Sequence, residues 1–141
     1  MIVRTAALAF AAALLAMSSA HAEAGAVGEW DTHHGGGVVR ISECDGALCG
    51  KVIDSEPLKT DPDAKDIRNA DASLRNRPLK GLTVFYGVKG GPTEWTGGSV
   101  YNPEDGKTYH GSIKLVDADT LKLTGCVFAP LCESQTWTRI K

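Results

Sequence analysis

The chain has 141 residues, and its 15 basic and 17 acidic side chains give a net charge of −2 at pH 7. This length fits a single domain that can bury a core without a metal or a partner. The slight excess of negative charge offers no basic face for a phosphate backbone, which argues against nucleic acid binding.

Residues 1–22 have the features of a cleavable signal peptide. Arg4 precedes an apolar run over residues 6–17, and small residues lead to the A-x-A pattern Ala20-His21-Ala22, which predicts cleavage after Ala22. The run is shorter than the roughly 20 apolar residues that span a bilayer, and no later stretch is as apolar. We therefore expect a periplasmic or secreted protein without a membrane span, in which residues 23–141 form one domain. Because the signal peptide holds Arg4, 14 of the 15 basic residues remain beside 17 acidic ones, a net charge of −3.

The exported part alternates short apolar and polar stretches between glycine, proline and asparagine punctuation, and it has no long segment of helical period. This pattern predicts an all-β domain. Eight strands are expected, over residues 27–32, 38–43, 48–54, 82–88, 94–101, 108–115, 120–127 and 134–140. Turn signals such as Asp45-Gly46 join neighbours as hairpins, so we predict a small eight-stranded, antiparallel, up-and-down barrel. The interior of such a barrel is just large enough to be filled by side chains or to hold one small ligand.

All four cysteines lie in the exported part, where an oxidising compartment favours their pairing. Three connectivities are open to four cysteines. The local one, Cys44 with Cys49 and Cys126 with Cys132, is favoured because each pair flanks a short turn that brings the chain back on itself. A zinc site is disfavoured by the wide spacing and the compartment, and a redox pair by the absence of C-x-x-C.

Residues 55–80 show little apolar patterning and are too many for an ordinary hairpin loop. We expect this loop to form a lid across one mouth of the barrel. Asp71 can cap a short helical turn that ends before Pro78. The carboxylates of Asp61, Asp63 and Asp66 lack the glycine and the distal glutamate of a calcium loop, which favours a solvated acidic turn over a metal site.

Several spaced motifs, found in one order along nearly the whole exported part, resemble an exported bacterial family, the domain-of-unknown-function family twenty-one forty-seven. The motifs are Gly28-x-Trp30, Asp66-x-x-Asn69, Leu74-Arg75-Asn76-Arg77-Pro78-Leu79-x-Gly81, Gly98-x-Val100-Tyr101-Asn102-Pro103, Gly106-Lys107-x-Tyr109 and Gln135-Thr136-Trp137-Thr138-Arg139. The resemblance implies a small lipocalin-like, or calycin, barrel in the bacterial envelope, without established enzymatic activity. The chain is shorter than lipocalins, which argues against a roomy cavity.

Two residues at opposite ends of the domain are candidates for closing the barrel. In lipocalins the tryptophan of G-x-W packs against an arginine of the last strand, and Trp30 and Arg139 match these positions. A guanidinium on an indole face contributes roughly 0.5 to 2 kcal/mol and would here tie the first strand to the last. Trp137 shares a face with Arg139 and is expected either in the core or as a roof over one end.

Candidates for ligand recognition lie in the long loop and on adjoining strands. In one interpretation Asp66 pairs with Arg75 or Arg77 and holds the loop together, with Asn69 beside them. In the other, Arg75 or Arg77 meets the anionic head of an amphipathic ligand at the barrel mouth. The tail would then enter between Val84, Tyr86, Tyr109 and Ile113, and Tyr101 would complete the set of tentative ligand-binding residues.

The chain shows no motif of a known catalytic or cofactor site. It has neither a G-x-S-x-G elbow nor an H-E-x-x-H helix. His33 and His34 are adjacent, which points them to opposite faces of a strand and suits no shared metal ion, and His110 has no evident partner. We therefore expect no enzyme, no cofactor and no metal.

These observations leave two leading functions. The first is a periplasmic carrier for a small apolar or amphipathic molecule. The second is an envelope protein-interaction module whose barrel is filled and whose long loop or glycine-rich segment 87–98 docks a partner. A hydrolase using loop carboxylates is a distant third. An internal void lined by Val39, Ile41, Val84, Tyr109 and Leu121 would support the carrier, whereas a filled interior would support the docking module.

Overall fold

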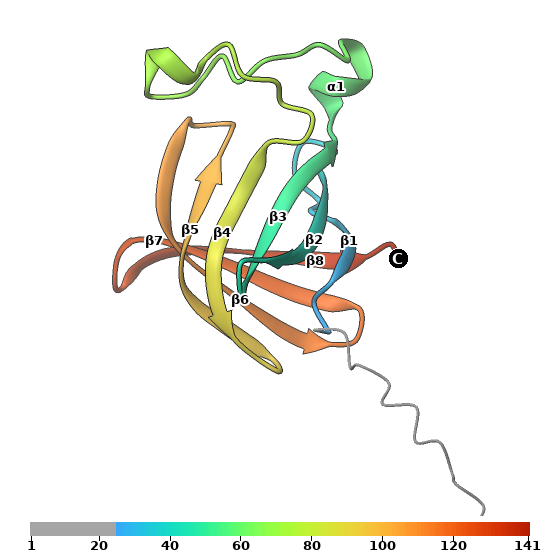
Figure 1. The fold of residues 1–141 in the computed structure, drawn as a ribbon, viewed down its shortest axis with the longest axis vertical. Helices are drawn as coiled ribbons and strands as arrows, with labels where there is room; N and C mark the ends of the chain where they lie inside the picture. The colour runs from blue at the N-terminus through green and yellow to red at the C-terminus, as the bar shows by residue number, and fades with distance from the viewer. Residues whose placement is uncertain (1–24) are drawn as a thin grey trace, which may run out of the picture.

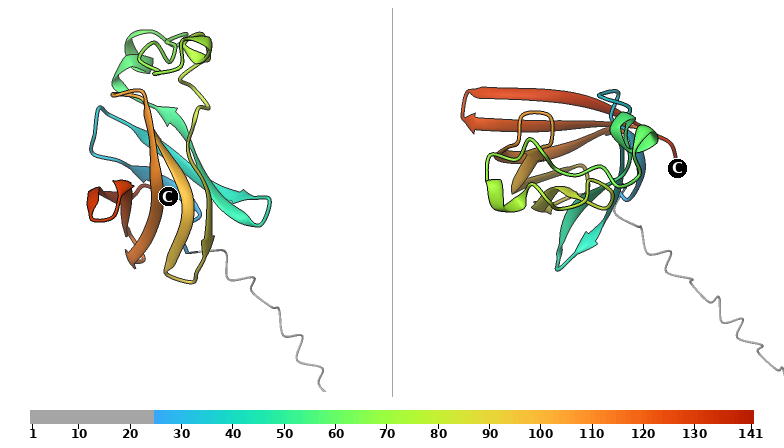
Figure 2. Two further views of the ribbon diagram at one scale, coloured as in Figure 1. Left: turned by 90° about the vertical axis from the view of Figure 1, so that its left-hand side faces the viewer. Right: turned by 90° about the horizontal axis from the view of Figure 1, so that it is seen from above.

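The computed structural model describes residues 25–141 as a closed barrel of eight antiparallel strands in sequential order (Figures 1 and 2). The strands are β1 Gly28–Asp31, β2 Val38–Cys44, β3 Ala47–Asp54, β4 Thr83–Gly90, β5 Glu94–Asn102, β6 Lys107–Asp117, β7 Thr120–Phe128 and β8 Leu131–Arg139. The predicted fold class and all eight predicted strands are confirmed. The predicted signal peptide lies outside the described residues.

The first and last strands pair directly, so the sheet has no free edge between them. Trp30 and Asp31 of β1 lie opposite Arg139 and Thr138 of β8. The Arg139 guanidinium lies over the Trp30 ring, with its Cζ atom 4.3 Å from the ring centroid. The same side chain donates hydrogen bonds of 2.8 Å to the carbonyls of Val27 and Ala118. The closing seam is therefore held by a cation on an aromatic face and by charged hydrogen bonds to two separate backbone segments.

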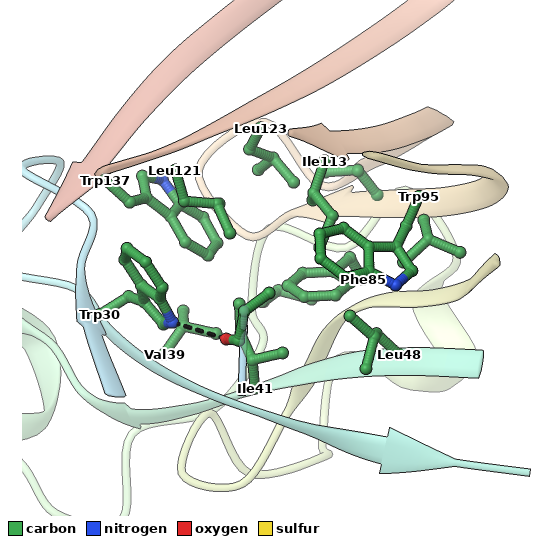
Figure 3. Close-up of a cluster of buried hydrophobic side chains, with 14 of the residues drawn as sticks. Trp30, Val39, Ile41, Leu48, Phe85, Trp95, Ile113, Leu121, Leu123 and Trp137 are labelled. Atoms are coloured by element: carbon green, nitrogen blue, oxygen red, sulfur yellow. Dashed lines mark hydrogen bonds between the residues drawn. The ribbon is translucent and has the colours of Figure 1, made fainter. Parts of the chain in front are cut away.

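Large aromatic side chains fill the barrel (Figure 3). Trp30 and Phe85 are completely buried, Trp137 and Trp95 are 2% and 4% exposed, and the rings of Phe85 and Trp137 lie 6.2 Å apart. Gly50 of β3 makes room for this packing, because a Cβ atom there would lie only 2.3 Å from the Phe85 ring. Trp137 is thus a core residue.

The packing of the interior bears on the choice between the two leading functions. Of the five residues that would line an internal void in a carrier, Val39, Ile41, Val84 and Leu121 belong to the packed core. The fifth, Tyr109, is half-buried, and its hydroxyl donates a hydrogen bond to the Asp105 carboxylate. Three tryptophans and a phenylalanine occupy the volume that a ligand tail would need, since each large ring fills space that small aliphatic residues would leave open.

Residues 55–80 lie across one end of the barrel (Figure 1). They contain the helix α1, Glu56–Thr60, and the 3-10 turn η1, Ala72–Leu74. Asp71 caps η1 by accepting the Ser73 N–H, as the sequence predicts. The helix α1 was not predicted, although Ser55 and Pro57 are typical of a helix start. Leu58 of α1 packs against the barrel core and anchors the loop.

Both cysteine pairs lie at hairpins. Cys44 and Cys49 form a disulfide across the β2–β3 turn, with Cα atoms 5.9 Å apart. Cys126 and Cys132 lie opposite each other in the β7–β8 register and form the second, with Cα atoms 4.0 Å apart. The β7–β8 hairpin projects beyond the body of the barrel (Figure 2), so the second disulfide joins its two strands close to the tip.

Candidate functional site

An open pocket of about 600 Å³ lies between the long loop and the rim of the barrel. The loop contributes one side, and the ends of β4, β5 and β6 contribute the other. The lining side chains mix cationic, acidic, aromatic and apolar groups and include those of Asn69, Asp71, Leu74, Arg77, Tyr86, Tyr101 and Lys107. Such a mixture suits a ligand that has both a charged and an apolar part.

One wall of the pocket is built around a buried carboxylate, that of Asp66. Its side chain is fully buried and accepts hydrogen bonds from the Tyr101 hydroxyl at 2.5 Å, from Asn69 Nδ2 at 2.9 Å and from Arg77 Nε at 2.8 Å. A charge removed from water is tolerated only when it is paired and hydrogen-bonded in this way. Asp66 therefore fastens the loop to β5 and orients Arg77.

The structure decides between the two arginines that the sequence offered as partners of Asp66. Arg77 is the partner, and its Cζ atom lies 4.9 Å from the centroid of the Tyr101 ring. Arg75 instead donates through Nε to the Asn69 carbonyl at 2.8 Å and does not line the pocket. Among residues 25–141, the Nη groups of Arg77 donate no hydrogen bond, so the side chain that lines the pocket keeps donors for a ligand.

Tyr101 is held in its neutral form. Burial, together with the hydrogen bond to the Asp66 carboxylate, raises the pKa of Tyr101 to about 12. The phenol therefore keeps its proton at physiological pH and serves as a hydrogen-bond donor to Asp66. It is a fixed part of the wall and offers no base to a substrate.

The loop is docked on the tight turn between β5 and β6. The Ala70 N–H donates to the Gly106 carbonyl at 2.9 Å, and Arg68 Nη1 donates to the Glu104 carbonyl at 3.4 Å. Gly106 has φ +74°, and a Cβ atom there would overlap the Arg68 carbonyl oxygen. Only glycine permits so close an approach, because it has no side chain and adopts positive φ freely.

The structure brings three of the five predicted ligand-binding residues, Arg77, Tyr86 and Tyr101, to one pocket. Arg75 and Tyr109 are not among its lining residues. Lys107 and Leu74 line the pocket although no role was predicted for them. Both lie inside the spaced motifs of the sequence, but only the folded chain shows that the two motifs meet.

The described residues contain no group of three or more metal-ligating side chains. The carboxylate of Asp61 accepts the Asp63 N–H and closes a turn. His33 Nε2 lies 2.8 Å from the Thr138 hydroxyl and thus joins the end of β1 to β8. No helix within residues 25–141 has the length and apolarity needed to cross a bilayer.

The eight-stranded closed barrel, filled by side chains and covered at one end by a loop, defines a lipocalin-like fold. The chain belongs to the family described as "Uncharacterized protein conserved in bacteria (DUF2147)", which matches residues 28–139. A similar solved structure is protein HP1028 from Helicobacter pylori, described as a member of the lipocalin family. It shares 24% identity and a TM-score of 0.71 with this chain, and the match covers 82% of each. No curated protein matches the chain.

Proposed function

We propose that this chain is an exported, lipocalin-like binding protein that holds a small amphipathic molecule in the rim pocket. The observation that carries the proposal is the arrangement of Arg77. Its Nε is fixed by the buried Asp66 carboxylate, whereas its Nη groups donate no hydrogen bond within residues 25–141, and the side chain lines an open pocket that also contains Tyr86 and Leu74. A guanidinium oriented in advance binds a carboxylate or phosphate at low entropic cost.

The apolar part of the ligand would lie on the rim and not in the lumen. Tyr86 is 51% exposed and Leu74 is 39% exposed, and both line the pocket. Val84 and Ile113, which we expected to flank an entering tail, are 7% and 1% exposed in a packed core. A chain of medium length or a single ring therefore suits the site better than a long acyl chain.

Export to the periplasm or the cell exterior is part of the proposal. The A-x-A pattern at Ala20-His21-Ala22 supports it. The two disulfides, Cys44–Cys49 and Cys126–Cys132, are consistent with an oxidising compartment.

Calorimetric titration with decanoate and with decanol tests the function. Decanoate should bind, and decanol should bind at least about tenfold more weakly because it cannot pair with Arg77 or Lys107. Lys107→Gln and Tyr86→Ala should each weaken decanoate binding, because they remove a charge and an apolar face from the pocket. Val116→Ala, an exposed apolar residue outside the pocket, is the matched control.

Two results would count against the proposal: decanoate that does not bind, or binding that both pocket variants leave intact. Native mass spectrometry of the protein purified from the periplasm gives a second readout. A retained small molecule that is lost in Tyr86→Ala would support the rim pocket.

A protein-docking module remains the second candidate, and two observations favour it. The barrel interior is filled, and the tip of the β7–β8 hairpin exposes Val127, Phe128 and Leu131, which are 58%, 60% and 57% accessible. Exposed apolar clusters are typical of interaction sites. A photo-crosslinking residue at position 128 should then capture one partner in cells, whereas the same probe at position 116 should not. Capture that is equal at both positions would argue against docking at the tip.

A further inference from the structure

A second hollow lies on the outer face of β2 and β3, apart from the rim pocket. It has a volume of about 470 Å³, and its lining includes the side chains of Arg40, Ser42, Lys51, Ile53 and Lys80. None of the residues that line it also lines the rim pocket. We call it the basic groove.

The fold places the three cations of the basic groove together. Arg40 and Lys51 are directly opposite in the β2–β3 register, so their side chains share the outer face of the sheet. Lys80 is brought to this face by the end of the long loop. There the Gly81 N–H donates to the Val52 carbonyl at 2.7 Å, and the Val52 N–H donates to the Leu82 carbonyl at 2.9 Å. The position of Lys80 is thus fixed by backbone pairing with β3.

The three cations of the basic groove have fewer carboxylate partners than they could bind. Arg40 binds Glu29 through Nε at 3.3 Å and Nη2 at 2.7 Å. Glu29 already lies near a second cation, Lys141, at 3.8 Å. Within residues 25–141, Lys51 and Lys80 have no carboxylate within salt-bridge distance. Like charges directly opposite on neighbouring strands are destabilising, and here they occur in a chain whose net charge is negative.

The floor of the groove is apolar. Ile53 of β3 is half-buried and shares the outer face with Lys51, two residues before it. The aliphatic stems of Lys51 and Lys80 can extend this surface while their ammonium groups stay in water. An anionic group between the ammonium groups and an apolar chain along Ile53 would satisfy both features at once.

We propose that the basic groove is a binding site for a phosphate monoester carried on an apolar chain. Phosphate oxygens would be bound by Lys51, Lys80 and the Nη1 group of Arg40, which donates no hydrogen bond within the described residues. The site is independent of the rim pocket, so either one can fail experimentally without the other.

Calorimetric titration with decyl phosphate, decanol and inorganic phosphate tests the site. Decyl phosphate should bind at least about tenfold more tightly than either of the other two, because only it offers both the charge and the chain. The double variant Lys51→Glu, Lys80→Glu should lose most of this affinity. Lys122→Glu is the matched control, because Lys122 also faces a lysine, Lys114, across the sheet but does not line the groove.

Three further measurements test the role of the apolar floor, the location of the bound ligand and the source of the phosphate. Ile53→Ser should weaken decyl phosphate binding and leave the response to inorganic phosphate unchanged. Amide resonances of residues 51 and 80 should shift on titration, and they should still do so in the rim-pocket variant Tyr86→Ala. Sedimentation with phosphatidic acid vesicles shows whether the groove also takes the phosphate from a bilayer, in which case the double variant should not sediment.

The proposal is overturned if the double variant and Lys122→Glu bind decyl phosphate equally well. It is also overturned if inorganic phosphate binds as tightly as decyl phosphate, or if the amide shifts are confined to the rim pocket. Circular dichroism of each variant verifies the fold, which the substitution of exposed lysines should not change.

Discussion

Asp66 is the residue on which the organisation of the rim pocket depends. It is a fully buried carboxylate, and its oxygens accept hydrogen bonds from an arginine, a tyrosine and an asparagine. Removing one partner from such a group costs more than the pair contributes, because the charge is left unsatisfied away from water. Substitution of any of its three partners should therefore lower the free energy of unfolding.

Tyr101→Phe should destabilise the protein by about 1 to 3 kcal/mol at neutral pH, because one Asp66 oxygen loses its donor. Tyr101 is neutral in the fold up to its pKa of about 12, whereas a tyrosine in the unfolded chain ionises near pH 10. The stabilisation by this phenol is therefore complete below about pH 10 and is lost as the pH rises toward about 12. Urea unfolding between about pH 8 and 11.5 should show the difference between native and variant shrinking across this window.

Tyr86→Phe is the control for this experiment. The Tyr86 hydroxyl has no hydrogen-bond partner among residues 25–141, and its side chain is exposed, so its removal should leave the free energy of unfolding unchanged. A stability difference between native and Tyr101→Phe that stays constant from neutral pH to pH 11.5 would show that the ionisation of Tyr101 is not linked to folding.

The long loop is attached to the barrel at several points along its length. Leu58 of α1 packs on the core, Asp66 binds β5, and Ala70 binds the β5–β6 turn. These contacts are spread along the loop, so each one can be weakened without detaching the whole segment. The pocket exists only while the loop is docked, which couples its shape to these contacts.

Gly106→Ala should undock the middle of the loop, because the new Cβ atom would overlap the Arg68 carbonyl. Gly46→Ala is a matched control, since Gly46 has a similar φ of +77° but no atom within 4 Å of the added Cβ. Both variants carry the strain of a non-glycine residue at positive φ, about 1 kcal/mol. Hydrogen exchange at the Ala70 amide should accelerate in Gly106→Ala and remain at the native rate in Gly46→Ala. Equal rates in the two variants would contradict the docking contact.

The strands could be predicted because the sequence features that determine them are local. Alternation, turn residues and cysteine spacing act within a few positions, and they place the β2–β3 and β6–β7 hairpins almost as the structure has them. The observed β8 begins three residues earlier than expected, because the turn at the hairpin tip is tight and pairing reaches Phe128 and Leu131. The short helix α1 was missed because the apolar pattern of the loop is weak, although its cap residues were visible.

The candidate site could be predicted only in part, because the contacts that build it join residues far apart in the sequence. Asp66 and Tyr101 are 35 positions apart, and the sequence cannot show which arginine reaches the buried carboxylate. The number of apolar residues also does not show whether the interior of the barrel is an open cavity or is filled by side chains. That distinction depends on how Phe85 fits over Gly50, a contact between two strands.

For the molecule as a whole, the joining of β1 to β8 converts a curled sheet into a closed barrel. Two residue pairs of these strands are in register, and the seam continues in backbone hydrogen bonds that join Glu29 to Ile140 and Lys141. This pairing is shorter than that between the other neighbouring strands, so side chains contribute a larger share of the closure. Trp30 and Arg139 supply this contribution, because the indole is completely buried and the guanidinium covers it.

A double-mutant cycle on Trp30 and Arg139 measures how much their contact contributes to the free energy of unfolding. Arg139→Met should cost about 2 to 4 kcal/mol, through the lost cation–π contact and the hydrogen bonds to the Val27 and Ala118 carbonyls. Trp30→Leu keeps apolar bulk in the core but removes the aromatic face. Because each substitution alone abolishes the contact, the double variant should be more stable than additivity predicts, by about 0.5 to 2 kcal/mol. The free energies come from urea unfolding followed by circular dichroism. Strict additivity would show that the seam is held by the backbone and the carbonyl contacts, with no share from the arginine on the indole.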